Sequence, residues 1–118
     1  MKKNNSFLEA ILNAFSGMKY FFLNEINGII QLAVATVIIA LSVGLKVNTF
    51  EWIVVLVCIG FVMGLEMLNT AIENLSNLVQ KEYHPTIKIV KDVAAAAVLL
   101  AATVSILIGS IIFLPKIF

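Results

Sequence analysis

Three apolar stretches, each long enough to cross a lipid bilayer, constrain this sequence more than any other feature. Residues 28–45 and 93–114 carry no charged side chain, and residues 52–72 carry one, Glu66. A helix needs about 20 predominantly apolar residues to span the hydrocarbon core. Because a bilayer offers no water to the backbone, a single segment crosses it as a helix. The sequence therefore predicts an all-α integral membrane protein with three transmembrane helices.

The overall composition supports this placement and narrows the classes of function. Hydrophobic residues make up 61% of the 118, and the mean hydropathy is +1.04, well above the usual globular composition. Eight lysines and no arginine stand against seven acidic residues, which is too balanced for a nucleic-acid-binding protein. The only cysteine, Cys58, excludes an internal disulfide and a thiolate metal site.

The stretch before the first apolar run predicts a helix that lies on the membrane surface. From about residue 6 to residue 23, apolar side chains recur at three- and four-residue spacings with polar ones between them, the pattern of an amphipathic helix. Its Phe and Lys content suits the plane of the interface. The loops are short, so residues 1–118 are predicted to form one domain, with Pro85 beginning the last helix and Pro115 ending it.

The distribution of lysines predicts the orientation in the membrane. Six lysines lie on one side of the spans and two on the other. The six are Lys2, Lys3, Lys19, Lys81, Lys88 and Lys91, and the two are Lys46 and Lys116. Because lysines near spans concentrate on the cytoplasmic side, the N-terminus and the loop between the second and third spans are predicted to be cytoplasmic.

A stripe of polar side chains leaves the second span on this predicted cytoplasmic side. Glu66, Asn69 and Glu73 are followed by Asn77, and a helix places all four along one face. A carboxylate within a span is unfavourable by roughly 2.5 to 3.5 kcal/mol. Glu66 is therefore a candidate functional residue.

Glu25, just before the first span, is predicted to lie at a depth similar to that of Glu73. Carboxylates brought together repel each other unless a cation or proton intervenes, and Mg²⁺ typically takes one or two protein carboxylates plus phosphate oxygens. Lys91 could meet those phosphates as a point charge. These parts predict metal-assisted phosphoryl transfer, with Glu66 accepting a proton from a lipid hydroxyl.

Each of these residues also has a simpler explanation when it is taken alone. Glu66 and Asn69 could hold helices together by hydrogen bonds, and Glu73 and Lys91 could form a weak salt bridge. Such explanations account poorly for acids, amides and lysines that gather on one side of the membrane.

Two residues outside the stripe have similarly modest explanations. His84 could be a loop or capping residue, and Asp92 could cap its helix or neutralise Lys88, one turn back. Beyond single residues, a membrane scaffold and a small ion or proton carrier remain alternatives to an enzyme.

Longer motifs run through the chain in order. They are NAFSGMKYFFLNE from Asn13 to Glu25, ExxNTAIE from Glu66 to Glu73, EYHP from Glu82 to Pro85, and KxxKDxAAAAVLLAA from Lys88 onward. With these motifs the chain resembles the prokaryotic membrane diacylglycerol kinase and undecaprenol kinase family over nearly its whole length.

The resemblance implies a homotrimer in the bacterial cytoplasmic membrane, with sites between subunits, that uses ATP and Mg²⁺ to phosphorylate a lipid alcohol. It implies Glu66 as the catalytic base and Glu25 and Glu73 as metal ligands. The residues implied to be catalytic or to contact the nucleotide are Asn69, Lys91 and Asp92. Those implied to line the nucleotide are Glu82, Tyr83 and His84.

The chain also departs from the family pattern. Residues 26–31 lack the basic side chains that usually follow the Asn-Glu pair, and Asn77 stands where Asp is common. No arginine is present for the family's N-terminal basic contact, which leaves Lys2 or Lys3 as substitutes. These changes suggest reduced activity or an altered substrate. EYHP and KDVAAAAV favour undecaprenol over diacylglycerol as the acceptor.

Overall fold

The computed structural model describes residues 6–118, which are built from four helices. In chain order they are α1 (Ser6–Asn24), α2 (Ile26–Gly44), α3 (Thr49–Val79) and α4 (Pro85–Ile117). The last three are long and apolar enough to cross a membrane. The predicted all-α fold, with one leading helix and three spans, is confirmed.

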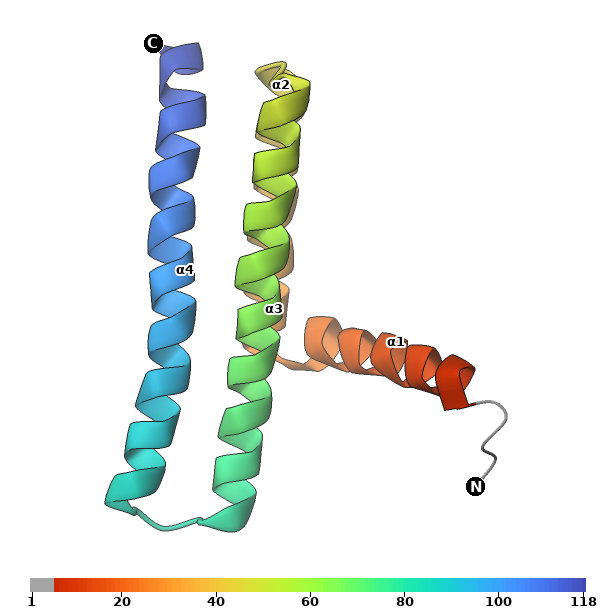
Figure 1. Cartoon of the computed structure of the whole chain (residues 1–118), viewed down its shortest axis with the longest axis vertical. Helices are drawn as coiled ribbons and strands as arrows, with labels where there is room; N and C mark the ends of the chain where they lie inside the picture. The colour runs from red at the N-terminus through yellow and green to blue at the C-terminus, as the bar shows by residue number, and fades with distance from the viewer. Residues whose placement is uncertain (1–5) are drawn as a thin grey trace.

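The helices form an upright bundle from which α1 projects at a steep angle (Figure 1). Helices α3 and α4 pack side by side as an antiparallel hairpin, and α2 packs against α3 behind it in this view. Helix α1 contacts α2 and leaves the bundle nearer to the α3–α4 linker than to the C-terminus. This arrangement suits a helix that lies in the membrane plane while the other three cross it.

The ends of the long helices agree with the sequence patterns except at Pro115. Helix α3 continues past the second predicted span to Val79, and Pro85 begins α4, as predicted. The prediction that Pro115 ends the last helix is wrong, because α4 continues to Ile117. Proline lacks an amide donor, so residue 115 makes no bond to the carbonyl of Ile111, but the residues after it can still be helical. The Phe118 amide still donates to the Leu114 carbonyl at 3.0 Å.

The end of the bundle opposite the α3–α4 linker is closed by apolar packing, a helix cap and an ion pair. The buried residues of this cluster are Val47, Val55, Ile112 and Phe113. The Asn48 side chain accepts from the Glu51 amide at 2.8 Å, and the Glu51 carboxylate accepts from the Asn48 amide at 2.9 Å, a complete capping box. The Glu51 carboxylate also lies 3.1 Å from Lys116 Nζ. The polar side chains at this end are therefore explained by the contacts that they make within the protein.

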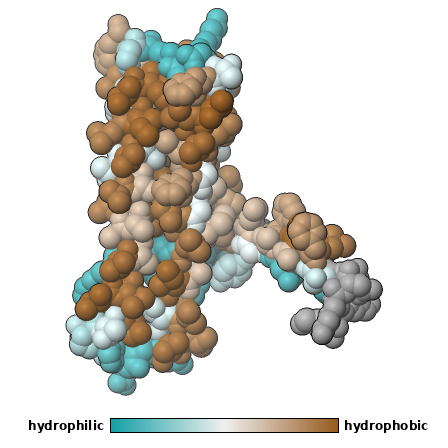
Figure 2. Space-filling view, viewed as in Figure 1, coloured by the Kyte–Doolittle hydropathy of each residue, from teal (hydrophilic) through white to brown (hydrophobic). Residues whose placement is uncertain are grey.

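Many large apolar side chains of the spans face outward. Hydrophobic residues cover the shaft of the bundle, and hydrophilic residues gather toward its two ends (Figure 2). Val37, Phe61 and Ile106, one from each span, are all more than 60% exposed. An apolar surface of this extent marks a membrane or protein contact, so the shaft is the part of the protein that lies in the bilayer.

Candidate active site

The packed face of α3 changes from apolar to polar near the middle of the helix. Its buried residues are Val55 and Val62 in the first half, then Glu66, Asn69, Thr70 and Ser76 in the second. Burying a polar group without a partner is unfavourable by roughly 1 to 3 kcal/mol. Packing alone therefore does not explain the buried polar residues in the second half of α3. Their presence indicates that they serve a function.

Glu66, Asn69 and Thr70 lie within about one turn of one another on this polar face, and we call them the buried polar cluster. Their exposed fractions are 7%, 6% and 8%. Within residues 6–118, Oδ1 of Asn69 and Oγ1 of Thr70 have no hydrogen-bond partner. If Asn69 and Thr70 held helices of one chain together, these atoms would be bonded, so they weigh against that explanation within a single subunit. Buried polar atoms left unpaired in a protein call for an explanation, and a bound ligand is one.

The elbow between α1 and α2 carries Glu25. This residue alone separates the two helices, and its extended backbone (φ −98°, ψ 129°) makes it the N-cap of α2. In the described chain its carboxylate does not cap the helix, so its oxygens are free to serve a ligand. Gly28 permits the elbow, since a Cβ at this position would lie 2.0 Å from the Phe21 carbonyl oxygen.

Lys91 is held on the side of α4 that faces α3. Its Nζ donates to Oδ1 of Asn77 at 2.6 Å, which joins the polar stretch of α3 to the start of α4. The salt bridge between Lys91 and Glu73 that the sequence allowed is not formed among residues 6–118. Because its hydrogen-bond partner is a neutral amide, the positive charge of Lys91 is oriented without being neutralised.

Asp92 lies next to Lys91 in sequence but makes a different contact. Its carboxylate is 2.6 Å from Lys88 Nζ, and both side chains are more than half exposed. An exposed pair of this kind contributes little stability. In the structure Asp92 thus pairs with Lys88, which is one of the simpler roles that the sequence suggested for it.

The linker before α4 carries the three residues that the resemblance assigns to the nucleotide. Glu82, Tyr83 and His84 are all exposed. His84 Nδ1 accepts from the Thr86 amide at 3.2 Å and caps α4, which confirms the capping explanation. The linker follows directly after the polar half of α3.

Glu25 and Glu73 are the two carboxylates predicted to bind magnesium. Within residues 6–118, no three side chains of His, Cys, Asp and Glu come together as a metal site would require. Both glutamates are half-buried and offer carboxylate oxygens. Mg²⁺ normally takes one or two protein carboxylates and completes its shell with water and phosphate oxygens. Each glutamate therefore has the donor chemistry that magnesium arriving with a nucleotide takes.

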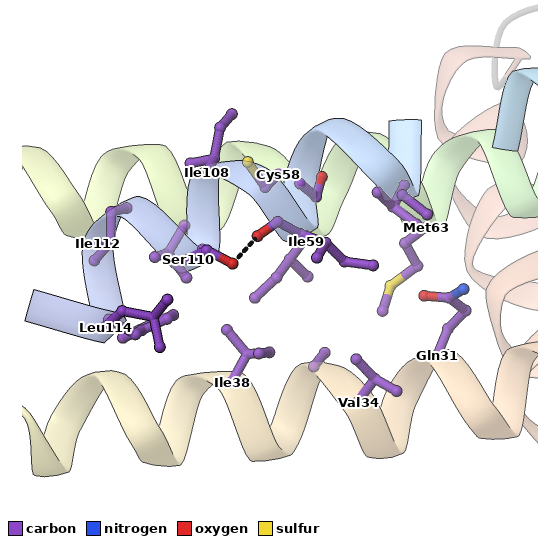
Figure 3. Close-up of a pocket in the computed structure, with 18 residues that line it drawn as sticks. Gln31, Val34, Ile38, Cys58, Ile59, Met63, Ile108, Ser110, Ile112 and Leu114 are labelled. Atoms are coloured by element: carbon purple, nitrogen blue, oxygen red, sulfur yellow. Dashed lines mark hydrogen bonds between the residues drawn. The ribbon is translucent and has the colours of Figure 1, made fainter. Parts of the chain in front are cut away.

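An apolar cavity of about 460 Å³ opens between α2, α3 and α4 within the spans (Figure 3). Gln31 and Met63 line one end of it, and Ile112 and Leu114 line the other. Met63 precedes Glu66 by three residues on α3, so one end of the cavity lies toward the buried polar cluster. Its size is within the usual range for ligand pockets.

Comparison with known proteins decides which family has this arrangement. Residues 12–113 match the family model described as prokaryotic diacylglycerol kinase. The chain belongs to this family. It is thus a lipid kinase of a family of ATP-dependent enzymes and a multi-pass membrane protein, as the motifs indicated.

Two relatives of this lipid kinase differ in their named substrates. Over 112 residues the chain is 35% identical to the undecaprenol kinase of Bacillus subtilis (strain 168), covering 95% of this chain and 91% of that protein. Over 103 residues it is 36% identical to the diacylglycerol kinase of a Synechocystis species, covering 86% of this chain but 59% of that protein.

Sequence reasoning missed two features of the candidate site in this kinase. Thr70 was not singled out, although its position four residues after Glu66 already placed it on the same helix face. The hydrogen bond between Asn77 and Lys91 joins two helices, and no local sequence pattern predicts it. Lys2 and Lys3, considered as basic contacts, lie outside the described residues.

Two lysines one turn apart on α4 provide a matched test of the site. Lys91→Met is expected to lower kcat/KM for ATP about tenfold, the effect of losing one charge-assisted hydrogen bond to phosphate. Lys88→Met is expected to have a clearly smaller effect, because it removes an exposed ion pair with Asp92 of little energetic worth and leaves Lys91 in place. Steady-state kinetics with ATP varied would measure both, and equal losses in the two variants would refute a special role for Lys91.

Proposed function

We propose that this kinase transfers the γ-phosphate of ATP to the hydroxyl of a membrane lipid alcohol, with undecaprenol as the preferred acceptor. The proposal is carried by the buried polar cluster, which lies just after the apolar first half of α3. This cluster encloses a carboxylate and two polar atoms without hydrogen-bond partners in the described residues. Undecaprenol is favoured because the undecaprenol kinase matches over 91% of its length, and the diacylglycerol kinase over 59%.

In the proposed reaction Glu66 is the general base. The acceptor hydroxyl gives its proton to the Glu66 carboxylate while its oxygen bonds to the γ-phosphorus. The bond between that phosphorus and the bridging oxygen breaks, and ADP leaves. Burial of Glu66 supports this role, because an enclosed site keeps water from competing with the lipid for the phosphoryl group.

The surrounding charges bind and orient the nucleotide in this proposal. Lys91 contacts the phosphates, and Glu25 and Glu73 hold the magnesium that accompanies ATP. When bound, this ion neutralises charge on the β- and γ-phosphates. Asn69 orients the reacting groups beside Glu66. The residues assigned to line the nucleotide are Glu82, Tyr83, His84 and Asp92.

The proposed assembly is a homotrimer with its sites between subunits, oriented with the N-terminus and the α3–α4 linker in the cytoplasm. The described lysines support the orientation. Lys19, Lys81, Lys88 and Lys91 belong to α1 or to the linker end of the bundle, and Lys46 and Lys116 to the opposite end. This orientation places the buried polar cluster on the side where ATP is available.

A competition assay tests the acceptor. Purified protein in detergent, with ATP and Mg²⁺, is offered equal concentrations of undecaprenol and diacylglycerol, and the two phosphorylated lipids are separated and counted. Undecaprenyl phosphate is expected to be the main product, with the higher kcat/KM. If diacylglycerol is phosphorylated as efficiently or better, the assigned acceptor is wrong while the lipid kinase activity stands.

A further inference from the structure

We propose that the hydroxyl of Thr70 positions the acceptor hydroxyl of the lipid in the active site. This inference rests on the proposed function and adds a residue to it. The Thr70 side chain is only 8% exposed, and its Oγ1 has no hydrogen-bond partner within residues 6–118. A buried hydroxyl without a partner is unfavourable by roughly 1 to 3 kcal/mol, and a ligand that completes the bond offsets this.

Four other hydroxyls in the membrane-spanning helices donate within their own helix. They belong to Thr36, Ser42, Thr103 and Ser110, and each donates to the carbonyl four residues earlier at 2.8 Å. This bond is the ordinary solution for Ser and Thr inside a helix. For Thr70 the corresponding carbonyl belongs to Glu66, and within the described chain the bond is not made. The Thr70 hydroxyl therefore remains available to another molecule.

The position of Thr70 matches the needs of an alcohol acceptor. It follows Glu66 by four residues, so the two side chains are neighbours on one helix face. An alcohol has one proton to donate and two lone pairs to offer. When the proton points at the Glu66 carboxylate, the Thr70 hydroxyl donates to one lone pair. The other lone pair is then directed at phosphorus, and this fixed orientation is what positioning contributes to rate.

Thr70→Val tests this role because valine keeps the shape and removes only the hydroxyl. The expected kcat/KM for the lipid falls roughly 3- to 10-fold, the effect of one neutral hydrogen bond. KM for ATP is expected to stay unchanged. The melting temperature should not fall, since the hydroxyl has no partner in the protein to lose. Thr70→Ser, which restores a hydroxyl, is expected to recover the activity.

Matched controls are Thr36→Val and Thr103→Val, whose hydroxyls bond to their own helices and whose activity is expected to equal that of the parent. Parent-like lipid kinetics in Thr70→Val overturn the proposal. A loss that Thr70→Ser does not recover, or that Thr103→Val shares, also overturns it, because it reflects packing.

A parent that phosphorylates no lipid alcohol refutes the proposed function separately. Binding then decides the role of Thr70. A short-chain prenol is expected to raise the melting temperature of the parent but not that of Thr70→Val. Equal stabilisation, or none in either protein, overturns the role of Thr70.

Discussion

Glu66→Gln is expected to lower kcat for lipid phosphorylation by at least about 100-fold, because general-base catalysis contributes roughly 10²- to 10⁴-fold in rate. Glutamine keeps the size of the side chain but cannot take the proton of the acceptor hydroxyl. KM for ATP is expected to change little, since Glu66 is assigned to the acceptor and not to the phosphates. Steady-state kinetics and the melting temperature, measured on the same preparation, separate catalysis from folding.

The control for this variant is Glu9→Gln, which changes the same group on the exposed surface of α1 and should behave like the parent. A kcat in Glu66→Gln within a few-fold of the parent contradicts its role as the base. A different failure is also informative. If the Glu66→Gln oligomer dissociates while ATP binding persists, Glu66 holds helices together, as the simpler explanation of this residue requires.

Gly28→Ala is expected to have the next largest effect, although residue 28 is assigned no role in the chemistry. The added Cβ would lie 2.0 Å from the oxygen and 2.7 Å from the carbon of the Phe21 carbonyl. These are backbone atoms, so α1 must shift relative to α2, and Glu25 lies between the two helices. A misplacement of about 1 Å in an active site can lower the rate on the order of 100-fold, and a loss of this size is expected in kcat/KM.

Gly17→Ala is the matched control, because a Cβ at Gly17 meets nothing within 4 Å. Alanine should even favour helix α1 at this position. The distance between spin labels on α1 and α2 is expected to change in Gly28→Ala and not in Gly17→Ala. If both variants keep parent activity and the same label distance, the close contact at the elbow does not position Glu25.

The helices and the polar stripe were predictable because both follow from patterns local to the chain. The absence of charge from 28–45 and 93–114 specifies spans by itself. The spacing of Glu66, Asn69 and Glu73 specifies a common face once α3 is helical. That lysines and carboxylates gather toward the linker between α3 and α4 also follows from the order of residues along the chain.

The remaining features depend on contacts between helices or on side-chain conformation, and no local pattern encodes these. Whether Lys91 meets Glu73 or Asn77 depends on the relative rotation of α3 and α4. The unpaired hydroxyl of Thr70 depends on a rotamer, and the elbow at Gly28 depends on how closely α1 approaches α2. Pro115 was misjudged because a proline disrupts the turn before it and does not prevent the residues after it from being helical.

The most direct test of lipid kinase activity is transfer of label from [γ-³²P]ATP to lipid by the purified protein. A labelled lipid phosphate is expected with undecaprenol or diacylglycerol. Its formation should stop when EDTA removes Mg²⁺ and fall at least about 100-fold with Glu66→Gln. A parent protein that labels neither lipid in the presence of ATP and Mg²⁺ would contradict the proposed kinase activity and favour a non-catalytic membrane scaffold.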